Sequence, residues 1–254
     1  MPFTLIAHRG FSSRAPENTF YAFDLALDHG FDNVELDAQL TSDGELAVFH
    51  DQTVDRITDG SGPVSSHTLA ELRALDAAAG FTGDGRDYSG ARIPTLDEFL
   101  ERYSGKAHAH LELKSREAAL PEKVAEALRR RGWLEYADGG PFDAPGLTIT
   151  SFWADQLYRS VVRLPNVRHG WLVNEVTEET LEAASRLGIN GVYPRAATAN
   201  PEIVNAAREK GFTVRGWGVG SLDDLANLAR SGAQGTTVDW PDAARDHLAG
   251  LGVV

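Results

Sequence analysis

The chain has 254 residues, of which 42% are hydrophobic, 9% aromatic and 24% charged, an ordinary composition for a soluble globular protein. This composition excludes a disordered or collagen-like chain, and no segment has the roughly 20 consecutive apolar residues of a membrane helix. The formal net charge of −13 disfavours nucleic acids and anionic membranes as partners.

The absence of cysteine excludes disulfides, thiolate nucleophiles and cysteine-ligated zinc. It is compatible with a reducing compartment, and we expect a cytoplasmic protein. The first apolar run, residues 3–7, is too short for the hydrophobic region of a secretory signal and follows no basic segment.

Short aliphatic and β-branched runs alternate with helical patterns along the chain, which predicts repeated βα units over a parallel sheet. Strands are predicted at residues 3–8, 33–38, 107–113, 147–151, 168–173, 190–193, 213–219 and 235–238. Helical patterns follow at residues 18–29, 95–103, 116–131, 153–163, 177–187, 200–210, 222–231 and 242–249. Eight such units at this length predict one α/β domain over residues 1–254, a (β/α)₈ TIM barrel.

Start and stop signals support several of these helices. Thr95, Thr177 and Ser221 each precede an acidic first turn, as helix N-caps do. Glycines follow five of the patterns, as C-terminal caps do: Gly30, Gly132, Gly188, Gly211 and Gly232. A doubly wound sheet is the main alternative, but it normally has a glycine-rich phosphate loop after its first strand, and none is present.

The alternation is interrupted after the second strand. In residues 39–50, Asp43-Gly44 separates two alternating runs, which predicts a β-hairpin, and the connection is too short for a parallel crossover. The second strand is therefore expected to extend past the barrel rim and fold back. Residues 51–92, with one short helical pattern at 69–78, are then an insertion at the C-terminal face of the barrel. Because barrel active sites lie at this face, the insertion is a candidate lid or substrate wall.

Polar residues gather where the predicted strands end. They are His8-Arg9-Gly10 on the first strand, Glu35 and Asp37 on the second, His50-Asp51 on the returning hairpin strand, and Glu112 and Lys114 on the next. Since residues two apart share one face of a strand, Glu35, Asp37 and Glu112 are expected to point into the barrel near its top. Three carboxylates in one space repel each other unless they share protons or bind a cation. All-oxygen ligands favour a hard divalent ion, Mg²⁺ or Ca²⁺, over zinc.

Each feature alone has an ordinary structural interpretation. A Glu-x-Asp pair is usually a solvated strand face, Glu112 beside Lys114 resembles a surface ion pair, and a single histidine is more often a hydrogen-bonded structural residue. Their convergence at strand ends favours a site. His108 and His110 lie lower on the same face and are assigned to barrel-core packing. The remaining histidines are assigned structural roles: His29, His67, His169 and His247.

Short motifs in a fixed order run through nearly the whole chain. They are His8-Arg9-Gly10, Pro16-Glu17-Asn18-Thr19, Glu35-Leu36-Asp37, Thr41-Ser42-Asp43-Gly44, His50-Asp51, Asp55-Arg56, Ile93-Pro94-Thr95-Leu96, Leu111-Glu112-Leu113-Lys114 and Asp239-Trp240-Pro241. Each motif is weak alone, but the ordered set resembles the glycerophosphodiester phosphodiesterases. The fold of that family is a (β/α)₈ barrel with an insertion after the second strand, which agrees with the prediction from the elements.

The resemblance implies hydrolysis of a glycerophosphodiester to glycerol 3-phosphate and an alcohol, with one divalent cation, Mg²⁺ or Ca²⁺. Glu35, Asp37 and Glu112 are the expected metal ligands. His8 and His50 are the expected general acid–base pair, since the unperturbed pKa of histidine lies near neutrality.

The expected substrate contacts come from two cations and one aromatic residue. Arg9 offers a planar fork and Lys114 a compact charge for the phosphate oxygens. Trp217 is expected to contact the glycerol carbons, and packing in the barrel is the alternative role for this residue. Where the family usually has a Trp-Thr-Val-Asn-like stretch, this chain has Trp217-Gly218-Val219-Gly220, which changes the alcohol pocket more than the chemistry. Glu17 and Asn18 are expected to organise the first βα loop rather than to contact the substrate, with Asn18 as the N-cap of the first helix. The implied partner is a small-molecule substrate, with no nucleic acid and no membrane insertion.

Two other functions remain open. A metal-dependent sugar isomerase or epimerase also gathers Glu, Asp and His at the strand ends of a barrel, but it needs no phosphate-binding Arg9 and Lys114. A non-catalytic barrel that binds a phosphoester is the second, and the presence of both histidines and all three carboxylates disfavours it. Phosphodiester hydrolysis with and without a chelator separates the enzymes.

Overall fold

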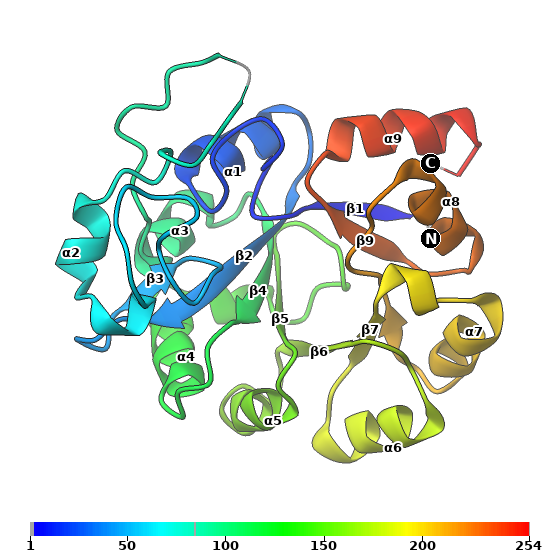
Figure 1. Ribbon diagram of the computed structural model, residues 1–254. Coiled ribbons are helices and arrows are strands. Elements are labelled where there is room, and N and C mark those ends of the chain that lie inside the picture. Colours follow the sequence, from blue (N-terminus) through cyan, green and yellow to red (C-terminus); the bar gives the residue numbers. More distant parts are fainter. Residues whose placement is uncertain (1–2, 84, 254) are drawn as a thin grey trace.

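Eight parallel strands form a nearly closed barrel in the computed structural model, which describes residues 3–83 and 85–253 (Figure 1). In the order of hydrogen bonding they are β8 (Thr213–Val214), β7 (Gly191–Pro194), β6 (Arg168–Val173), β5 (Gly146–Ser151), β4 (His108–Leu113), β2 (Asn33–Leu40), β1 (Thr4–Ala7) and β9 (Gly235–Val238). A single bridge between Gly216 and Thr236 joins the two ends of this order. The predicted TIM barrel is confirmed. Met1, Pro2, Asp84 and Val254, which belong to the predicted domain, lie outside the described residues.

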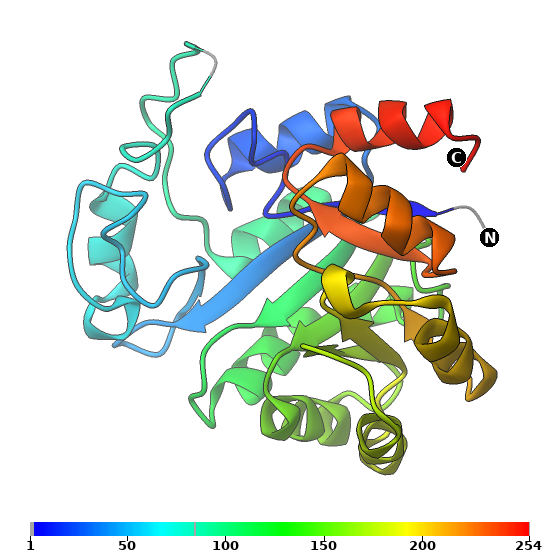
Figure 2. The same ribbon diagram turned by 45° about the vertical axis from the view of Figure 1, so that its right-hand side comes forward.

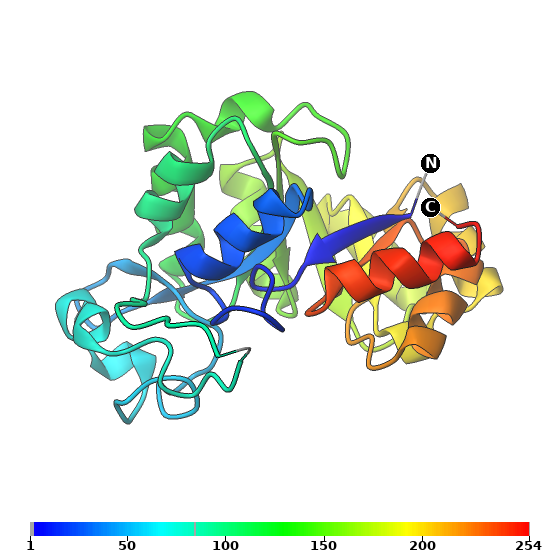
Figure 3. The ribbon, with the colours of Figure 1, turned by 90° about the horizontal axis from the view of Figure 1, so that it is seen from above.

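Helices surround the barrel, one after each strand (Figures 1 and 2). They are α1 (Phe20–Asp28), α3 (Leu96–Tyr103), α4 (Leu120–Arg130), α5 (Ala154–Arg163), α6 (Glu178–Leu187), α7 (Pro201–Glu209), α8 (Leu222–Arg230) and α9 (Pro241–Gly250). Short 3₁₀ turns, η2 (Trp133–Tyr136) and η3 (Ala196–Thr198), lie in two of the connections. The helix α9 packs on β1, which lies between α9 and α1 when the molecule is seen from above (Figure 3). Among the described residues, none of these helices is both long enough and apolar enough to span a bilayer.

The caps of the helices follow the sequence signals with one exception. Thr95, Thr177 and Ser221 each accept a hydrogen bond from a backbone N–H in the first turn, as expected. The prediction that Asn18 caps the first helix is wrong, because Thr19 accepts from Ala22 N and forms the N-cap. The side chain of Asn18 is directed into the barrel end instead.

The hydrophobic core lies between the strands and the helices. Leu36 and Leu111 face outward from their strands and are almost fully buried, while their polar neighbours face into the barrel. On the helix side, Phe23 of α1 and Phe99 of α3 meet edge to face at 4.9 Å, with Tyr103 against both. Burying apolar area on this side, at about 25 cal/mol per Å², stabilises the barrel and leaves its interior free for polar residues.

The predicted hairpin is confirmed at the end of β2. The strand β3 (Leu46–Val48) returns antiparallel to it, with Ala38 opposite Val48 and Leu40 opposite Leu46. Gly44 makes the turn with a φ of +77°, a backbone conformation that favours glycine. The hairpin continues directly into the insertion.

The insertion at residues 51–92 projects from one side of the barrel beside β3 (Figure 2). It contains η1 (Val64–Ser66) and α2 (Leu69–Ala74), and its apolar side chains form a separate small cluster that includes Val54 and Leu72. The helix predicted at 69–78 is too long, because Leu75 is already extended, with a ψ of 150°.

The strand predicted at 213–219 is also too long. Regular pairing ends at Val214, and only single bridges follow, at Gly216 and between Trp217 and Arg195. Gly218 then adopts a φ of +69°, which no strand residue has. The segment therefore turns across the mouth of the barrel as a loop and carries Trp217 with it.

Candidate active site

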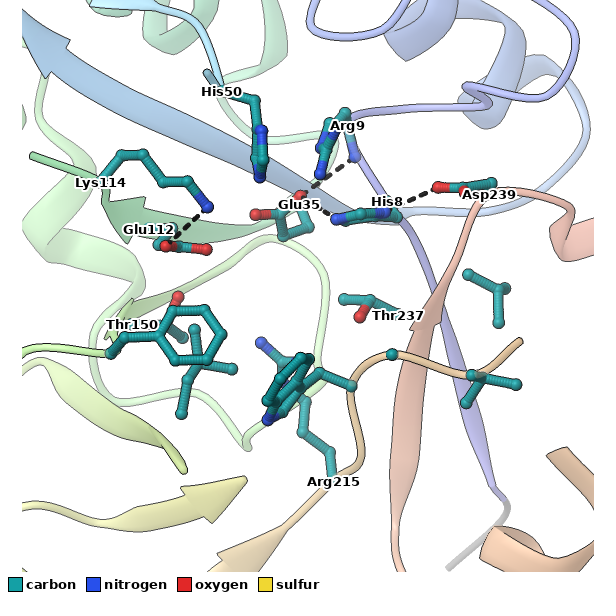
Figure 4. Close-up of a pocket in the computed structure, with 16 residues that line it drawn as sticks. His8, Arg9, Glu35, His50, Glu112, Lys114, Thr150, Arg215, Thr237 and Asp239 are labelled. Carbon is teal, nitrogen blue, oxygen red and sulfur yellow. Dashed lines mark hydrogen bonds and ion pairs between the residues drawn. The ribbon is translucent and has the colours of Figure 1, made fainter. Parts of the chain in front are cut away.

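A cavity of about 290 Å³ opens at the C-terminal ends of the barrel strands (Figure 4). Side chains from the ends of β1, β2, β4, β5, β6 and β9, from the hairpin and from the segment after β8 line it. Seven of the residues predicted from the sequence line the cavity: His8, Arg9, Glu35, His50, Glu112, Lys114 and Trp217. Asp37 lies behind them and is fully buried.

Glu35, Asp37 and Glu112 converge as predicted. One oxygen from each carboxylate lies within 4.8 Å of the other two, and all three residues are buried. Burial and the two neighbouring carboxylates raise the pKa of Glu35 well above its usual value, and burial raises that of Glu112 to about 7. For Asp37, the charges of Lys114, His50 and Arg9 outweigh burial and lower the pKa. The three carboxyls therefore resist ionising together, and a cation bound between them would favour the ionised forms of Glu35 and Glu112.

These three residues fit a hard divalent cation. Asp37 Oδ1 is buried and has no hydrogen-bond partner among the described residues, although Lys114 Nζ lies 3.5 Å away. A buried, unpartnered carboxylate oxygen is unfavourable unless a cation approaches it. The donors are all oxygens, which suits Mg²⁺ or Ca²⁺.

Two histidines face this group, and each is held by a carboxylate. His8 Nδ1 lies 2.6 Å from Asp239 Oδ1, and His50 Nδ1 lies 2.6 Å from Asp51 Oδ1. Because an ionised carboxylate only accepts hydrogen bonds, Nδ1 is the donor and Nε2 is left free. His8 Nε2 points toward Glu35, with 3.9 Å between them (Figure 4).

The electrostatics of the pairs support these orientations. The hydrogen bond and charge of His8 outweigh burial and lower the pKa of Asp239 to about 2, so Asp239 is ionised at neutral pH. Burial lowers the pKa of His50 from its ordinary value, which favours its neutral form. A neutral histidine with a free Nε2 can accept a proton.

Arg9 and Lys114 supply the positive charge. The backbone N–H of Arg9 donates to Glu35 Oε2 at 3.1 Å, and its side chain donates to Glu17 Oε1 at 2.8 Å. Lys114 Nζ donates to Glu112 Oε1 at 3.0 Å. Both side chains line the cavity, and both are mostly buried. They offer donors to an anion that enters the cavity.

A network behind the cavity joins the insertion to Arg9 and His50. Arg56 donates to both oxygens of Glu17, at 2.8 and 2.7 Å, and to Asp51 Oδ2 at 2.5 Å. Glu17 in turn holds Arg9, and Asp51 holds His50. Both residues belong to motifs found in the sequence, where Glu17 is expected to organise the first βα loop and Arg56 has no predicted role.

Asn18 takes a role in the site that differs from the predicted one. Its Nδ2 donates to Asp37 Oδ2 at 2.9 Å, so it orients an expected metal ligand. Asn18 adopts a φ of +54°, in the left-handed region that asparagine tolerates better than most residues. The conformation turns the amide toward Asp37.

Trp217 and Phe152 form an aromatic wall of the cavity. Their rings meet edge to face at 4.9 Å, and Trp217 Nε1 donates to Val173 O at 2.9 Å. Gly218 lines the cavity beside Trp217, whereas Gly220 does not. A second hollow continues from Phe152 along Trp153, Trp171, Val173 and Asn174.

The sequence predicted that the insertion is a candidate lid or wall of the substrate site, but it contributes almost no residues to the lining of the two hollows. Of the described part of residues 51–92, only Gln52 lines the second hollow, and none lines the first. The reason is that the insertion packs against β3 and its own cluster, to one side of the barrel mouth.

His108 and His110 lie deeper in the barrel, as expected. Their rings stack at 4.4 Å and both residues are fully buried. His108 bonds Thr148 and His110 bonds Asn33, so neither ring reaches the cavity. The polar residues that sequence reasoning missed include Asp51 and Asp239, which hold the histidines, and Thr150, Arg215 and Thr237, which line the lower part of the cavity.

Comparisons with known proteins identify similar sequences and structures. The family model described as glycerophosphoryl diester phosphodiesterase family matches residues 8–243. A glycerophosphodiester phosphodiesterase of Caldanaerobacter subterraneus subsp. tengcongensis is 34% identical over 242 residues, which cover 94% of each chain. A phosphodiesterase of Oleispira antarctica, solved in complex with the product sn-glycerol-3-phosphate, is similar with a TM-score of 0.86 and 27% identity, over 98% of this chain and 97% of that one. A glycerophosphodiester phosphodiesterase of Agrobacterium tumefaciens has a TM-score of 0.80 and 30% identity, over 96% and 99% of the two chains.

Proposed function

Because the chain belongs to the glycerophosphoryl diester phosphodiesterase family, we propose that it hydrolyses glycerophosphodiesters to glycerol 3-phosphate and an alcohol. The observation that carries this proposal is one cavity that holds three buried carboxylates, two histidines with free Nε2 atoms and two cations. The product complex of the Oleispira antarctica phosphodiesterase supports the substrate class.

The phosphodiester is an anion, and its charge repels a nucleophile. Arg9 and Lys114 lie where they can donate to its oxygens and neutralise this charge. A divalent cation held by Glu35, Asp37 and Glu112, either Mg²⁺ or Ca²⁺, supplies further positive charge beside the phosphoryl group when bound. Asn18 keeps Asp37 oriented for that role.

His8 and His50 transfer the protons. In the attack a bond forms between phosphorus and the incoming oxygen, from water or from a glycerol hydroxyl, and one histidine accepts the proton of that oxygen at Nε2. The bond from phosphorus to the alcohol oxygen then breaks, and the other histidine donates a proton to that oxygen. With water as the attacking group, glycerol 3-phosphate forms directly. With a glycerol hydroxyl as the attacking group, a cyclic phosphate forms first, and a water molecule then opens it to glycerol 3-phosphate by the same proton transfers. Asp239 and Asp51 keep Nδ1 of each ring protonated, so that Nε2 is the atom that exchanges the proton.

The lining of the cavity and the composition of the chain bear on how the substrate is held and where the enzyme works. Trp217 and Phe152 offer an apolar wall to the carbon atoms of the substrate. The cysteine-free chain with its charge of −13 supports a cytoplasmic enzyme with a small-molecule substrate rather than a nucleic acid.

The test is a coupled assay for glycerol 3-phosphate released from glycerophosphocholine, with bis(p-nitrophenyl) phosphate as a second substrate. We expect release that chelation abolishes and that Mg²⁺ or Ca²⁺ restores. A protein that binds glycerol 3-phosphate but turns over neither substrate would support the non-catalytic barrel instead. Isomerisation of a sugar phosphate without diester hydrolysis would support the isomerase.

A further inference from the structure

Arg215 is a buried cation in the wall of the cavity with no acidic partner. It is 1% exposed and lines the cavity, and no carboxylate of the described residues lies within 4.0 Å of its nitrogen atoms. Its Nη1 donates to Gly216 O at 3.4 Å, whereas Nε has no hydrogen-bond partner among the described residues. Buried guanidinium groups are normally paired, because removing their charge from water is costly. This arrangement therefore points to a partner that enters the cavity.

The side chain of Arg215 is held in place by Tyr193. The guanidinium carbon lies 4.4 Å from the centre of the Tyr193 ring, a cation–π arrangement. The ring occupies space that two glycines leave open, since a Cβ at Gly170 would lie 1.9 Å from it and a Cβ at Gly191 2.6 Å. Burial lowers the pKa of Arg215, while Tyr193, Glu35 and Glu112 favour its charged form. The donor is thus charged and oriented before any ligand binds.

Arg215 lies one layer of side chains below the reacting groups. It precedes Trp217 by two residues, as Thr237 of β9 precedes Asp239. Thr150 lines the same lower part, is fully buried, and its Oγ1 has no hydrogen-bond partner among the described residues. Figure 4 shows Thr150, Thr237 and Arg215 on the side of the cavity away from His50 and Arg9.

We propose that Arg215 is a substrate-binding residue that donates hydrogen bonds to the hydroxyl oxygens of the glycerol moiety, with Thr150 beside it. This inference rests on the proposed function. It assigns the selectivity of the enzyme for glycerol to the residues in the lower part of the cavity. The phosphate, with its single negative charge, is held above by Arg9 and Lys114. The glycerol chain then extends downward, where buried donors require oxygen acceptors. A site of this kind rejects an analogue that lacks the hydroxyls, because its donors would stay unpaired.

The experiment compares two variants of Arg215. Arg215→Met removes the charge but keeps much of the side-chain volume. Arg215→Lys keeps the charge but loses the planar guanidinium with its several donors. The matched control is Arg168→Met on β6, two strands away from β8, since Arg168 donates to Gly139 O and does not line the cavity. For Arg215→Met we expect kcat/KM on glycerophosphocholine to fall roughly 10- to 100-fold, the effect of one hydrogen bond from a charged donor. On bis(p-nitrophenyl) phosphate, which has no glycerol hydroxyls, kcat/KM should be unchanged. Arg215→Lys should retain part of the selectivity.

Calorimetry with the metal-loaded protein provides a readout without turnover. Arg215→Met should weaken the binding of glycerol 3-phosphate but not that of ethyl phosphate, and Arg168→Met should bind both as the wild type does. An equal loss of affinity for both ligands, or an equal loss of kcat/KM on both substrates, would overturn the proposal. Arg215 would then only balance the negative charge of the site. Unchanged selectivity in both Arg215 variants would overturn it too. If the wild type did not hydrolyse glycerophosphocholine, the proposed function would fail, while the calorimetry would still decide whether Arg215 binds hydroxyls.

Discussion

His8 and His50 come from different parts of the chain, but each presents the same atom to the cavity. A carboxylate binds Nδ1 in both cases: Asp239, which follows the neighbouring strand β9, binds His8, and the adjacent Asp51 binds His50. The side chains of His8 and His50 are 30% and 25% exposed, so both rings can reach a bound substrate. This shared geometry supports the proposal that they act as a matched acid–base pair.

We predict that His8→Ala and His50→Ala each reduce kcat by roughly 10²- to 10⁴-fold, as expected for a general acid or base, with a far smaller change in KM. His110→Ala is the control, because His110 is fully buried below the cavity. It should cost roughly 1–3 kcal/mol of stability and leave kcat nearly unchanged. Steady-state kinetics with urea unfolding checks both effects. A folded His110→Ala variant with the same kcat loss would contradict the division between catalytic and packing histidines.

The carboxylate group gives a second prediction at this scale. Glu35→Gln replaces one of the three carboxylates with a neutral amide, at a place where one oxygen of each lies within 4.8 Å of the other two. We expect Mg²⁺ or Ca²⁺ to bind more weakly by about tenfold or more, because a neutral amide replaces a carboxylate ligand. Isothermal calorimetry on chelator-treated protein measures this directly, with Glu45→Gln on the exposed hairpin as the control. Full activity of the metal-free wild type would exclude the metal site.

His169 allows a test of acid stability away from the site. It is buried between Ser160 and Val167 O, and burial lowers its pKa to about 4, below the usual 6.5. Between these values the unfolded chain binds a proton that the folded protein does not, so stability is lost as the pH falls below 6.5. His169→Gln removes this difference. From pH 7 to pH 5 the wild type should lose about 2 kcal/mol more than the variant in urea unfolding. Parallel losses would show that His169 does not contribute.

The first loop shows how two elements position the site together. Gly10 follows His8 and Arg9 with a φ of +79°, and a Cβ there would lie 2.6 Å from the backbone carbon of Ala22 in α1. The N–H of Phe11 donates to Ala22 O at 2.9 Å, so the loop and the helix are in direct contact. Only glycine allows this approach, and the approach sets where Arg9 leaves the strand.

We predict that Gly10→Ala destabilises the protein by about 2–5 kcal/mol, from the left-handed backbone and the overlap with α1 together. Gly30→Ala is the matched control, because Gly30 has the same φ of +79° but no atom within 4 Å of its Cβ position. It should cost only about 1–2 kcal/mol. Urea unfolding measures both, and equal losses would show that contact with α1 adds nothing.

The insertion acts on the site through charge pairs rather than as a wall. Arg56 joins Glu17, which holds Arg9, to Asp51, which holds His50. Its small apolar cluster keeps the segment packed on β3, and the hairpin transmits that position to His50. The insertion therefore fixes one side of the cavity without lining it.

For the whole molecule we predict broad tolerance of the headgroup with a strict need for glycerol. The residues proposed to bind the phosphate and the glycerol lie inside the barrel end, whereas Trp153 and Asn174 of the second hollow are exposed at the surface. The test compares kcat/KM for glycerophosphocholine, -ethanolamine, -glycerol and -inositol with that for a diester whose glycerol hydroxyls are methylated. A range above roughly 10²-fold among the four headgroups is more than one pocket contact supplies and would contradict the tolerance. Hydrolysis of the methylated diester at a comparable rate would contradict the need for glycerol.

The alternating strands and helices of the barrel and the convergence of the three carboxylates could be predicted from the sequence, because both depend on local periodicity. Residues two apart on a strand share a face, so Glu35 and Asp37 had to point the same way, and parallel strands bring Glu112 to the same edge. The Asp43-Gly44 turn fixed the hairpin in the same local way. Element ends were less predictable, as Val214 and Leu75 show, because tertiary contacts decide where regular pairing or helix stops.

The partners of the site residues were decided only by the tertiary structure. His8 and Asp239 are 231 positions apart and meet because β1 pairs with β9 in a register that the sequence does not state. Arg215 has no sequence signal, because its burial depends on Tyr193 filling the space above Gly170 and Gly191. Periodicity determines which face a side chain takes along its own strand. Which side chains meet across a closed barrel depends on the stagger of all the strands, and only the folded chain sets that.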